Sequence, residues 1–185
     1  GVLEEIRAKY SPRSTIETDV DITIWWAIRE REEKKSGHLL LAPGDMFDVS
    51  LGNSRWVCDG RTLWQYNGDA NQVIIKRLLD IDLSAHPSQV LATYLMDYEY
   101  DVREDNGRQT VLVWEADSAN PDRDYRSIEL TVDKRKMAVS TMVVVDNRGN
   151  RSTYAFRKTR FAITTTDANF TFTVPEGAHV LDVRE

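Results

Sequence analysis

The chain has 185 residues, of which 41% are hydrophobic and 29% are charged, and its 24 basic and 30 acidic side chains give a net charge of −6. This size predicts a single domain, residues 1–185, that needs neither a disulfide nor a metal to fold. The acidic balance argues against nucleic acid or an anionic membrane surface as the main partner, and no apolar run approaches the ~18 residues of a membrane span.

The first elements are a short helix and a long strand. Residues 2–10 carry apolar side chains at helical spacing, and Pro12 ends that segment. From Thr18 to Ile28 the apolar side chains recur at every second position, which is the clearest strand pattern in the chain. The charged run 29–36 predicts an exposed strand end and a turn.

Short strands follow, separated by turns rich in glycine, asparagine and aspartate. We expect them at 37–41, 47–51, 56–58, 62–66, 72–76, 98–103, 110–114, 128–132, 137–145, 153–158 and 170–174. A second helix is predicted at Pro87–Met96, because proline suits the first helical turn and an apolar stripe follows it. The sum is a mainly β (α+β) fold: one curved antiparallel sheet of about ten or eleven strands, with helices covering its concave apolar face.

Residues that carry chemistry are scattered. His38, His86 and His179 lack the spacing of metal ligands, and no phosphate-binding loop or nucleophile motif is present. Cys58 lies in an apolar strand, which predicts a buried, inert thiol. We therefore expect a protein that is not an enzyme and that has no metal and no cofactor, although an enzyme using an open barrel is the least favoured alternative.

The apolar side chains are the distinctive feature of this sequence. Their pattern alone indicates an ordinary packed core; the alternative is a cavity for an acyl chain, in which each buried methylene contributes ~0.8 kcal/mol. The expected lining is Val20, Ile22, Ile24, Trp26, Ile28, Leu39, Leu41, Phe47, Val49, Leu51, Trp64, Tyr66, Leu91, Tyr94, Leu95, Ile128, Leu130, Met142, Val144, Tyr154 and Phe156.

One stretch carries a family resemblance. Residues 57–67, VCDGRTLWQYN, resemble the V-x-DGKTLW-x-YN signature of the periplasmic outer-membrane lipoprotein carriers, the LolA family. The opening LEEIRAKY at 3–10, the two segments 142–146 and 151–156, and the closing FTFTVPEG at 170–177 are similar to the family's first helix, late hairpin and end, in the same order. The resemblance covers nearly the whole chain.

The resemblance implies an incomplete antiparallel β-barrel lidded by helices. It also implies a periplasmic chaperone for protein transport and outer membrane biogenesis, with a signal peptide already removed. Acylated lipoproteins would be its cargo, an inner-membrane lipoprotein-releasing ABC transporter its donor and an outer-membrane lipoprotein its acceptor. The chain would act as a monomer, by lipid binding and handover. The alternative is a lipid- or lipoprotein-sensing module of the same half-barrel fold in envelope signalling.

One position departs from the family pattern. In much of the family, an arginine before the proline of the second hairpin helps to hold the lid closed. Ala42 stands at the matching position, before Pro43. The lid mechanism of the family therefore does not carry over to this chain directly.

Overall fold

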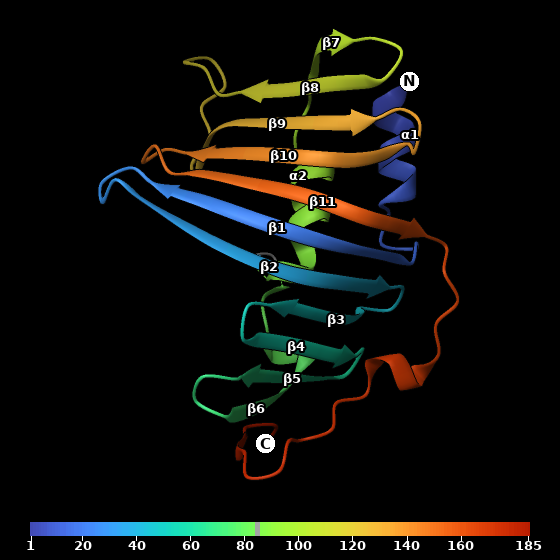
Figure 1. Cartoon of the computed structure of the whole chain (residues 1–185), viewed down its shortest axis with the longest axis vertical. Helices are drawn as coiled ribbons and strands as arrows, with labels where there is room; N and C mark the ends of the chain where they lie inside the picture. Colours follow the sequence, from blue (N-terminus) through green and yellow to red (C-terminus); the bar gives the residue numbers. More distant parts are fainter. Residues whose placement is uncertain (84–85) are drawn as a thin grey trace. The chain divides into compact units, whose positions relative to one another are not determined.

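The computed structural model describes residues 1–83 and 86–185, and Figure 1 labels its elements. Two kinds of helix, α and 3₁₀ (labelled η), accompany the strands. The elements are α1 (Val2–Lys9), β1 (Ile16–Trp26), β2 (Arg31–Ala42), β3 (Met46–Leu51), β4 (Ser54–Asp59), β5 (Thr62–Asn67), β6 (Gln72–Arg77), η1 (Leu78–Asp80), η3 (Pro87–Gln89), α2 (Val90–Met96), β7 (Asp101–Asp105), β8 (Gln109–Glu115), β9 (Tyr125–Asp133), β10 (Ala138–Asp146), β11 (Arg151–Phe161), η4 (Asp167–Phe170) and β12 (His179–Asp182).

The strands form one open sheet. Within the described residues its order is β12-β6-β5-β4-β3-β2-β1-β11-β10-β9-β8-β7, so β12 and β7 are the two edges and the sheet is not closed. The neighbouring pairs from β2 to β6 and from β7 to β11 are antiparallel, whereas β12 lies parallel to β6. The predicted mainly β fold with an incomplete barrel is confirmed.

The C-terminal part differs from the prediction. The strand expected at 170–174 is wrong, because Phe170 ends η4 and the next residues are extended without a paired strand. Phe170 and Phe172 are buried while Thr171 and Thr173 are exposed, so the alternation reflects burial alone. The strand β12 escaped prediction because all four of its residues are exposed and carry no alternation.

Two compact units make up the chain, and strands β1, β2 and β11 contribute to both. Unit 1 comprises residues 1–9, 20–36 and 94–157, and unit 2 comprises residues 10–19, 37–93 and 158–185. The expectation of a single domain over residues 1–185 stays a prediction. Each unit has its own pattern of burial.

Unit 1 buries one face of strands β8–β10. Met142 pairs with Leu130 on one side and Tyr154 on the other, and Leu130 pairs with Leu112. Directly paired residues share a face of the sheet. Helix α1 docks by its buried Ile6, and Arg7 donates hydrogen bonds to the carbonyl oxygens of residues 95 and 98, at 3.0 and 2.7 Å.

Aromatic rings fill the space beside this face in unit 1. The ring of Tyr98 lies 4.6 Å from that of Trp114 and 6.2 Å from that of Tyr125. The Tyr94 hydroxyl donates to the Tyr125 hydroxyl over 2.9 Å, and Tyr100 donates to the Tyr94 carbonyl oxygen. The rings are thus buried by edge-to-face packing, and their hydroxyl groups are paired by these hydrogen bonds.

Unit 2 buries both faces of its strands. On one face Leu41 pairs with Phe47, which pairs with Cys58, and Leu39 pairs with Val49. On the other face a second apolar cluster contains Val57, Val73 and Ile75, with Trp64 and Tyr66 packed against it and Phe172 covering it. The register confirms this placement, because Val57 pairs with Trp64 and Trp64 with Ile75.

The facing prediction is therefore wrong for Trp64 and Tyr66, which lie on the face opposite to Leu41 and Phe47. Trp64 and Tyr66 do share one face of β5, as their spacing predicts. Because both faces of β5 are covered, the spacing could not indicate which face lies on the side of Leu41 and Phe47. Ile28 is also wrongly placed. It is 86% exposed in the turn after β1, because the strand ends at Trp26.

The β4–β5 hairpin explains the signature stretch of residues 57–67. Asp59 Oδ1 accepts from the backbone N–H groups of Arg61 and Thr62, at 2.9 and 2.8 Å. Gly60 has φ +95°, and a Cβ there would lie 2.8 Å from the Gly44 carbonyl oxygen. Only glycine fits this turn, so the signature records turn geometry.

Candidate functional site

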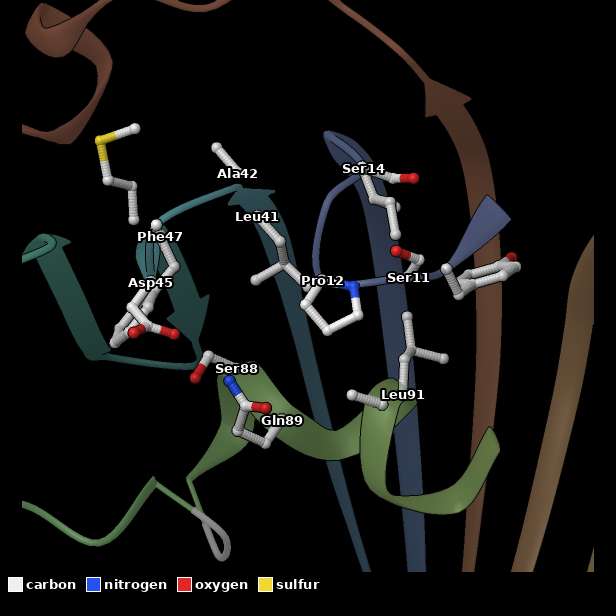
Figure 2. Close-up of a pocket in the computed structure, with 15 residues that line it drawn as sticks. Ser11, Pro12, Ser14, Leu41, Ala42, Asp45, Phe47, Ser88, Gln89 and Leu91 are labelled. Carbon is white, nitrogen blue, oxygen red and sulfur yellow. The ribbon is translucent and has the colours of Figure 1, made fainter. Parts of the chain in front are cut away.

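A pocket of about 180 Å³ lies in unit 2 (Figure 2). Three segments far apart in sequence form it: the stretch 10–16 between α1 and β1, the β2–β3 turn with its flanking residues 41–47, and the stretch 88–92 in η3 and α2. Pro12 prevents α1 from continuing, and Gly44 and Asp45, with φ +81° and +59°, allow the tight β2–β3 turn. Local backbone chemistry thus shapes the walls.

The lining combines an apolar floor with a polar rim. Leu41, Phe47 and Leu91 supply the floor, and Phe47 and Leu91 are almost fully buried. The polar lining residues are Ser11, Ser14, Asp45 and Gln89, together with the buried Ser88. Such a site can hold a hydrocarbon segment by desolvation while its polar end stays near hydrogen-bonding groups.

Leu41, Phe47 and Leu91 are the predicted cavity residues that line this pocket. Leu39, Val49 and Leu51 share the strand face of Leu41 and Phe47, as the register shows. The remaining predicted residues that lie in unit 1 are Val20, Ile22, Ile24, Trp26, Tyr94, Leu95, Ile128, Leu130, Met142, Val144, Tyr154 and Phe156, all of them buried or half-buried. That these residues contact an acyl chain stays a prediction.

Some lining residues were missed. Ile16 continues the β1 alternation one step before Thr18, and Tyr10 ends the apolar stripe of α1, so both had a signal in the pattern. Pro12 and Met46 carried none, because only the folded turn brings them to the pocket.

The side chain of Ala42 is held in an apolar cluster. It is 8% exposed and packs with Leu40 and Phe170 in an apolar cluster. Its strand partner is Met46, whereas Leu41 pairs with Phe47, so the side chains of Ala42 and Leu41 point to opposite faces. Ala42 also lines the pocket, and an arginine at this position would have to displace its apolar neighbours Leu40 and Phe170.

His86 lies beside the pocket. Its Nδ1 accepts the Ser88 backbone N–H over 3.2 Å and so caps η3, and its ring packs 5.0 Å from Phe47 and 5.7 Å from Trp56. Burial, with a smaller contribution from the charge of Lys76, lowers the pKa of His86 to about 4. The imidazole is therefore neutral at neutral pH.

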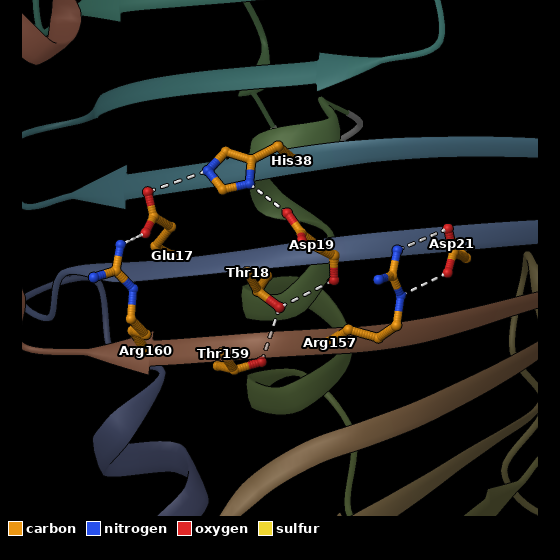
Figure 3. A network of polar contacts seen from close by, with 8 residues as sticks. All are labelled: Glu17, Thr18, Asp19, Asp21, His38, Arg157, Thr159 and Arg160. Atoms are coloured by element: carbon orange, nitrogen blue, oxygen red, sulfur yellow. Dashed lines mark hydrogen bonds and ion pairs between the residues drawn. The ribbon is translucent and has the colours of Figure 1, made fainter.

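Charged side chains cluster on the parts of β1, β2 and β11 that belong to unit 2 (Figure 3). Asp19 and Glu17 hydrogen-bond the two ring nitrogens of His38, at 2.6 and 3.2 Å, and Glu17 also pairs with Arg160. Burial disfavours the charged imidazole, but the hydrogen bonds and charges of Asp19 and Glu17 together outweigh it and raise the pKa of His38. Burial likewise opposes ionisation of Glu17, yet the hydrogen bonds from Arg160 and His38 lower its pKa.

This cluster is an ion-pair network. Both nitrogens of His38 are already occupied by carboxylates, and within residues 1–83 and 86–185 no group of three or more His, Cys, Asp or Glu is arranged to hold a metal ion. Cys58 is fully buried, as predicted, and burial raises the pKa of its thiol to about 11. Such a thiol is a poor nucleophile.

None of the described helices has the length and apolar character that crossing a bilayer requires. Helices α1 and α2 have 8 and 7 residues, against about 20 for a membrane-spanning helix.

Comparison with known proteins gives the family. The family model described as "Outer membrane lipoprotein carrier protein LolA" matches residues 29–173. A curated relative, the outer-membrane lipoprotein carrier protein of Wigglesworthia glossinidia brevipalpis, is 26% identical over 126 residues, which cover 68% of this chain and 58% of the relative. The match thus spans less than two thirds of the relative's length.

Solved structures agree on the fold. An uncharacterized conserved protein from Thermus thermophilus superposes with a TM-score of 0.55 at 16% identity, covering 98% of this chain and 96% of that one. A LolA superfamily protein from Nitrosomonas europaea gives 0.51 at 15% identity, covering 92% and 96%. Since the family model matches most of the sequence, the chain belongs to the family of the outer membrane lipoprotein carrier protein LolA.

Proposed function

We propose that this chain is a periplasmic carrier that binds the acyl chains of lipoproteins and moves them from the inner to the outer membrane. The observation that carries the proposal is the pocket with the apolar floor Leu41, Phe47 and Leu91 in a member of this family. The related protein of W. glossinidia is named for carrying outer-membrane lipoproteins. The role proposed is binding and handover, without catalysis.

The size of the pocket supports weak binding and easy release. A volume of 180 Å³ is close to the roughly 150 Å³ of a cavity that accepts one benzene ring. Burying about six carbons at ~0.8 kcal/mol each contributes about 5 kcal/mol, and the entropy of association offsets part of it. A complex of millimolar order results, which suits a carrier that must give up its cargo.

A longer acyl chain needs more room than this pocket offers. We infer that the segment 87–96 shifts when cargo binds, since η3 and α2 form one wall of the pocket and η3 is short. Differential affinity for a shifted state is also how an acceptor could trigger release. An inner-membrane ABC transporter as donor and an outer-membrane lipoprotein as acceptor complete the proposed route.

The test uses an acylated lipoprotein in inner-membrane vesicles that contain the releasing transporter. We expect the purified chain to release the acylated form in an ATP-dependent manner and to co-elute with it, whereas a cargo lacking acyl chains stays unbound. Leu41→Gln, on the pocket floor, should weaken binding several-fold, and Leu79→Gln, at a residue 93% exposed in the same unit, should not.

Two outcomes would contradict the carrier role. Binding that does not depend on acylation would remove the proposal entirely. Acyl-dependent binding without release from the vesicles would favour the sensing module of the same fold.

A further inference from the structure

His86 has a polar atom that the fold buries without a partner. Among the described residues, Nε2 of His86 finds no hydrogen-bond partner, although the atom is inaccessible to solvent. Buried polar groups are nearly always paired, because an unpaired one loses its bond to water and gains nothing. An orphan atom in an apolar setting therefore calls for a functional explanation.

The hydrogen bonding of the other ring nitrogen defines what this atom can do. Nδ1 accepts the Ser88 backbone N–H, so in the neutral ring the proton lies on Nε2. The pKa of about 4 keeps the ring neutral at ordinary pH. Nε2 is thus an uncharged hydrogen-bond donor, and it suits a neutral acceptor.

The surroundings of His86 connect it to the pocket. Phe47 packs against the imidazole at 5.0 Å and Ser88 hydrogen-bonds to it, and both residues also line the pocket. Trp56, whose ring lies 5.7 Å from the imidazole, shares the pocket-side face of the strands, because it pairs with Val49. His86 is not among the residues that line the pocket, so η3, of which Ser88 is part, has to move before a ligand in the pocket can reach the donor.

We propose that the Nε2–H of His86 donates a hydrogen bond to the carbonyl oxygen of an ester- or amide-linked acyl chain seated in the pocket. The inference rests on the proposed function and specifies the ligand further. In a hydrocarbon ligand of this kind the carbonyl group is the acceptor nearest to the chain, and the rings of Phe47 and Trp56 pack against the imidazole with apolar surface.

Two variants remove the donor in different ways. His86→Asn keeps a side-chain oxygen that can cap η3 by accepting from Ser88, and its amide N–H groups lie one bond closer to Cβ than Nε2 does, so they end short of its place. His86→Phe keeps an aromatic ring against Phe47 and Trp56. His38→Asn is the matched control, because it removes a histidine of the same unit whose nitrogens are engaged by carboxylates. Circular dichroism and thermal melting verify that each variant folds.

The measurement is displacement of a fluorescent apolar dye by methyl butanoate and by hexane, two probes of six chain atoms each, which match the size of the pocket. The ratio of the two affinities should fall about fivefold in both His86 variants relative to the unmodified chain, the loss expected for one hydrogen bond. Hydration of the probes cancels in this comparison. His38→Asn should leave the ratio unchanged.

The outcomes separate this inference from the proposed function. If the His86 variants bind both probes and the ratio of ester to alkane affinity is unchanged, the role of His86 is overturned and the acyl site is still supported. Failure of the unmodified chain to bind either probe would overturn both.

Discussion

The two units use similar strands and bury them differently. In unit 1, one face of β8–β10 carries Leu112, Ile128, Leu130 and Met142, all buried, and aromatic rings fill the space beside it. In unit 2, strands β3–β6 are covered on both faces, and the pocket adjoins one of them. The same alternating pattern therefore accompanies one buried face on β9 and two buried faces on β4–β6, where a pocket remains beside one of them.

Covering the second face has a consequence for the pocket. Phe172 and its neighbours cover the far side of β4–β6, and the cluster of Leu40 and Phe170 lies on that side next to β3, so the strand that carries Phe47 does not depend on the pocket side alone for its stability. The pocket side can therefore stay incompletely packed. Unit 1 has no comparable cover on β9 in the described chain: its residues on the other face, such as Glu129, are only half-buried.

Removing the Phe172 ring, which covers the second face of β4–β6, should change the free energy of unfolding most. Phe172→Ala takes away the ring that packs 6.0 Å from Tyr66 and beneath the Arg55 guanidinium, and we expect unfolding free energy to fall by about 3 kcal/mol. Urea denaturation measures the loss, and acrylamide quenching should show a more accessible tryptophan, Trp64. The control Val174→Ala, at a side chain 38% exposed, should cost less than about 1 kcal/mol. Equal effects would mean that unit 2 buries one face only.

An arginine at Ala42 should have the next largest effect. The side chain would enter the cluster of Leu40 and Phe170, so Ala42→Arg should destabilise the protein by about 2 kcal/mol through overpacking and charge burial. Ala42→Ser should be nearly neutral by comparison. Thermal melting measures the loss of stability, and the release rate of an acyl probe tests the family mechanism. Unchanged stability together with slower release would support a lid held from this position.

The smallest effect concerns His38 in the ion-pair network of unit 2. Because its pKa is raised above the ordinary 6.5, the folded chain binds the proton more tightly than the unfolded chain. This stabilisation is fully present below the ordinary pKa and is lost as pH rises through the folded pKa. His38→Gln should cost under about 1 kcal/mol near pH 5.5, since the side chain is 45% exposed, and nothing near pH 9. A loss that grew with pH would contradict the assignment of Asp19 and Glu17 as its partners.

Local chemistry made most of the fold predictable. The alternation of β1 from Val20 to Ile22 reports true burial, and Asp59-Gly60 marks a hairpin because the aspartate caps the turn that the glycine permits. Trp64 was misplaced because alternation gives two faces without naming them, and the cover that decides the matter, Phe172, lies more than a hundred residues away.

The pocket itself was less accessible to prediction. Leu41, Phe47 and Leu91 were expected to line a cavity, but the volume left between them depends on how Pro12 and the β2–β3 turn pack, which no pattern encodes. The unpaired Nε2 of His86 is likewise a property of three-dimensional surroundings. Both belong to tertiary packing, where sequence periodicity carries no information.

The near contact between Gly60 and the Gly44 carbonyl oxygen links the signature stretch to the wall of the pocket. Gly44 is part of the pocket wall, whereas Gly60 is not. Any side chain at Gly60 would push the β2–β3 turn outward and reshape the opening from behind. The signature stretch thus constrains the shape of a pocket that none of its own residues lines.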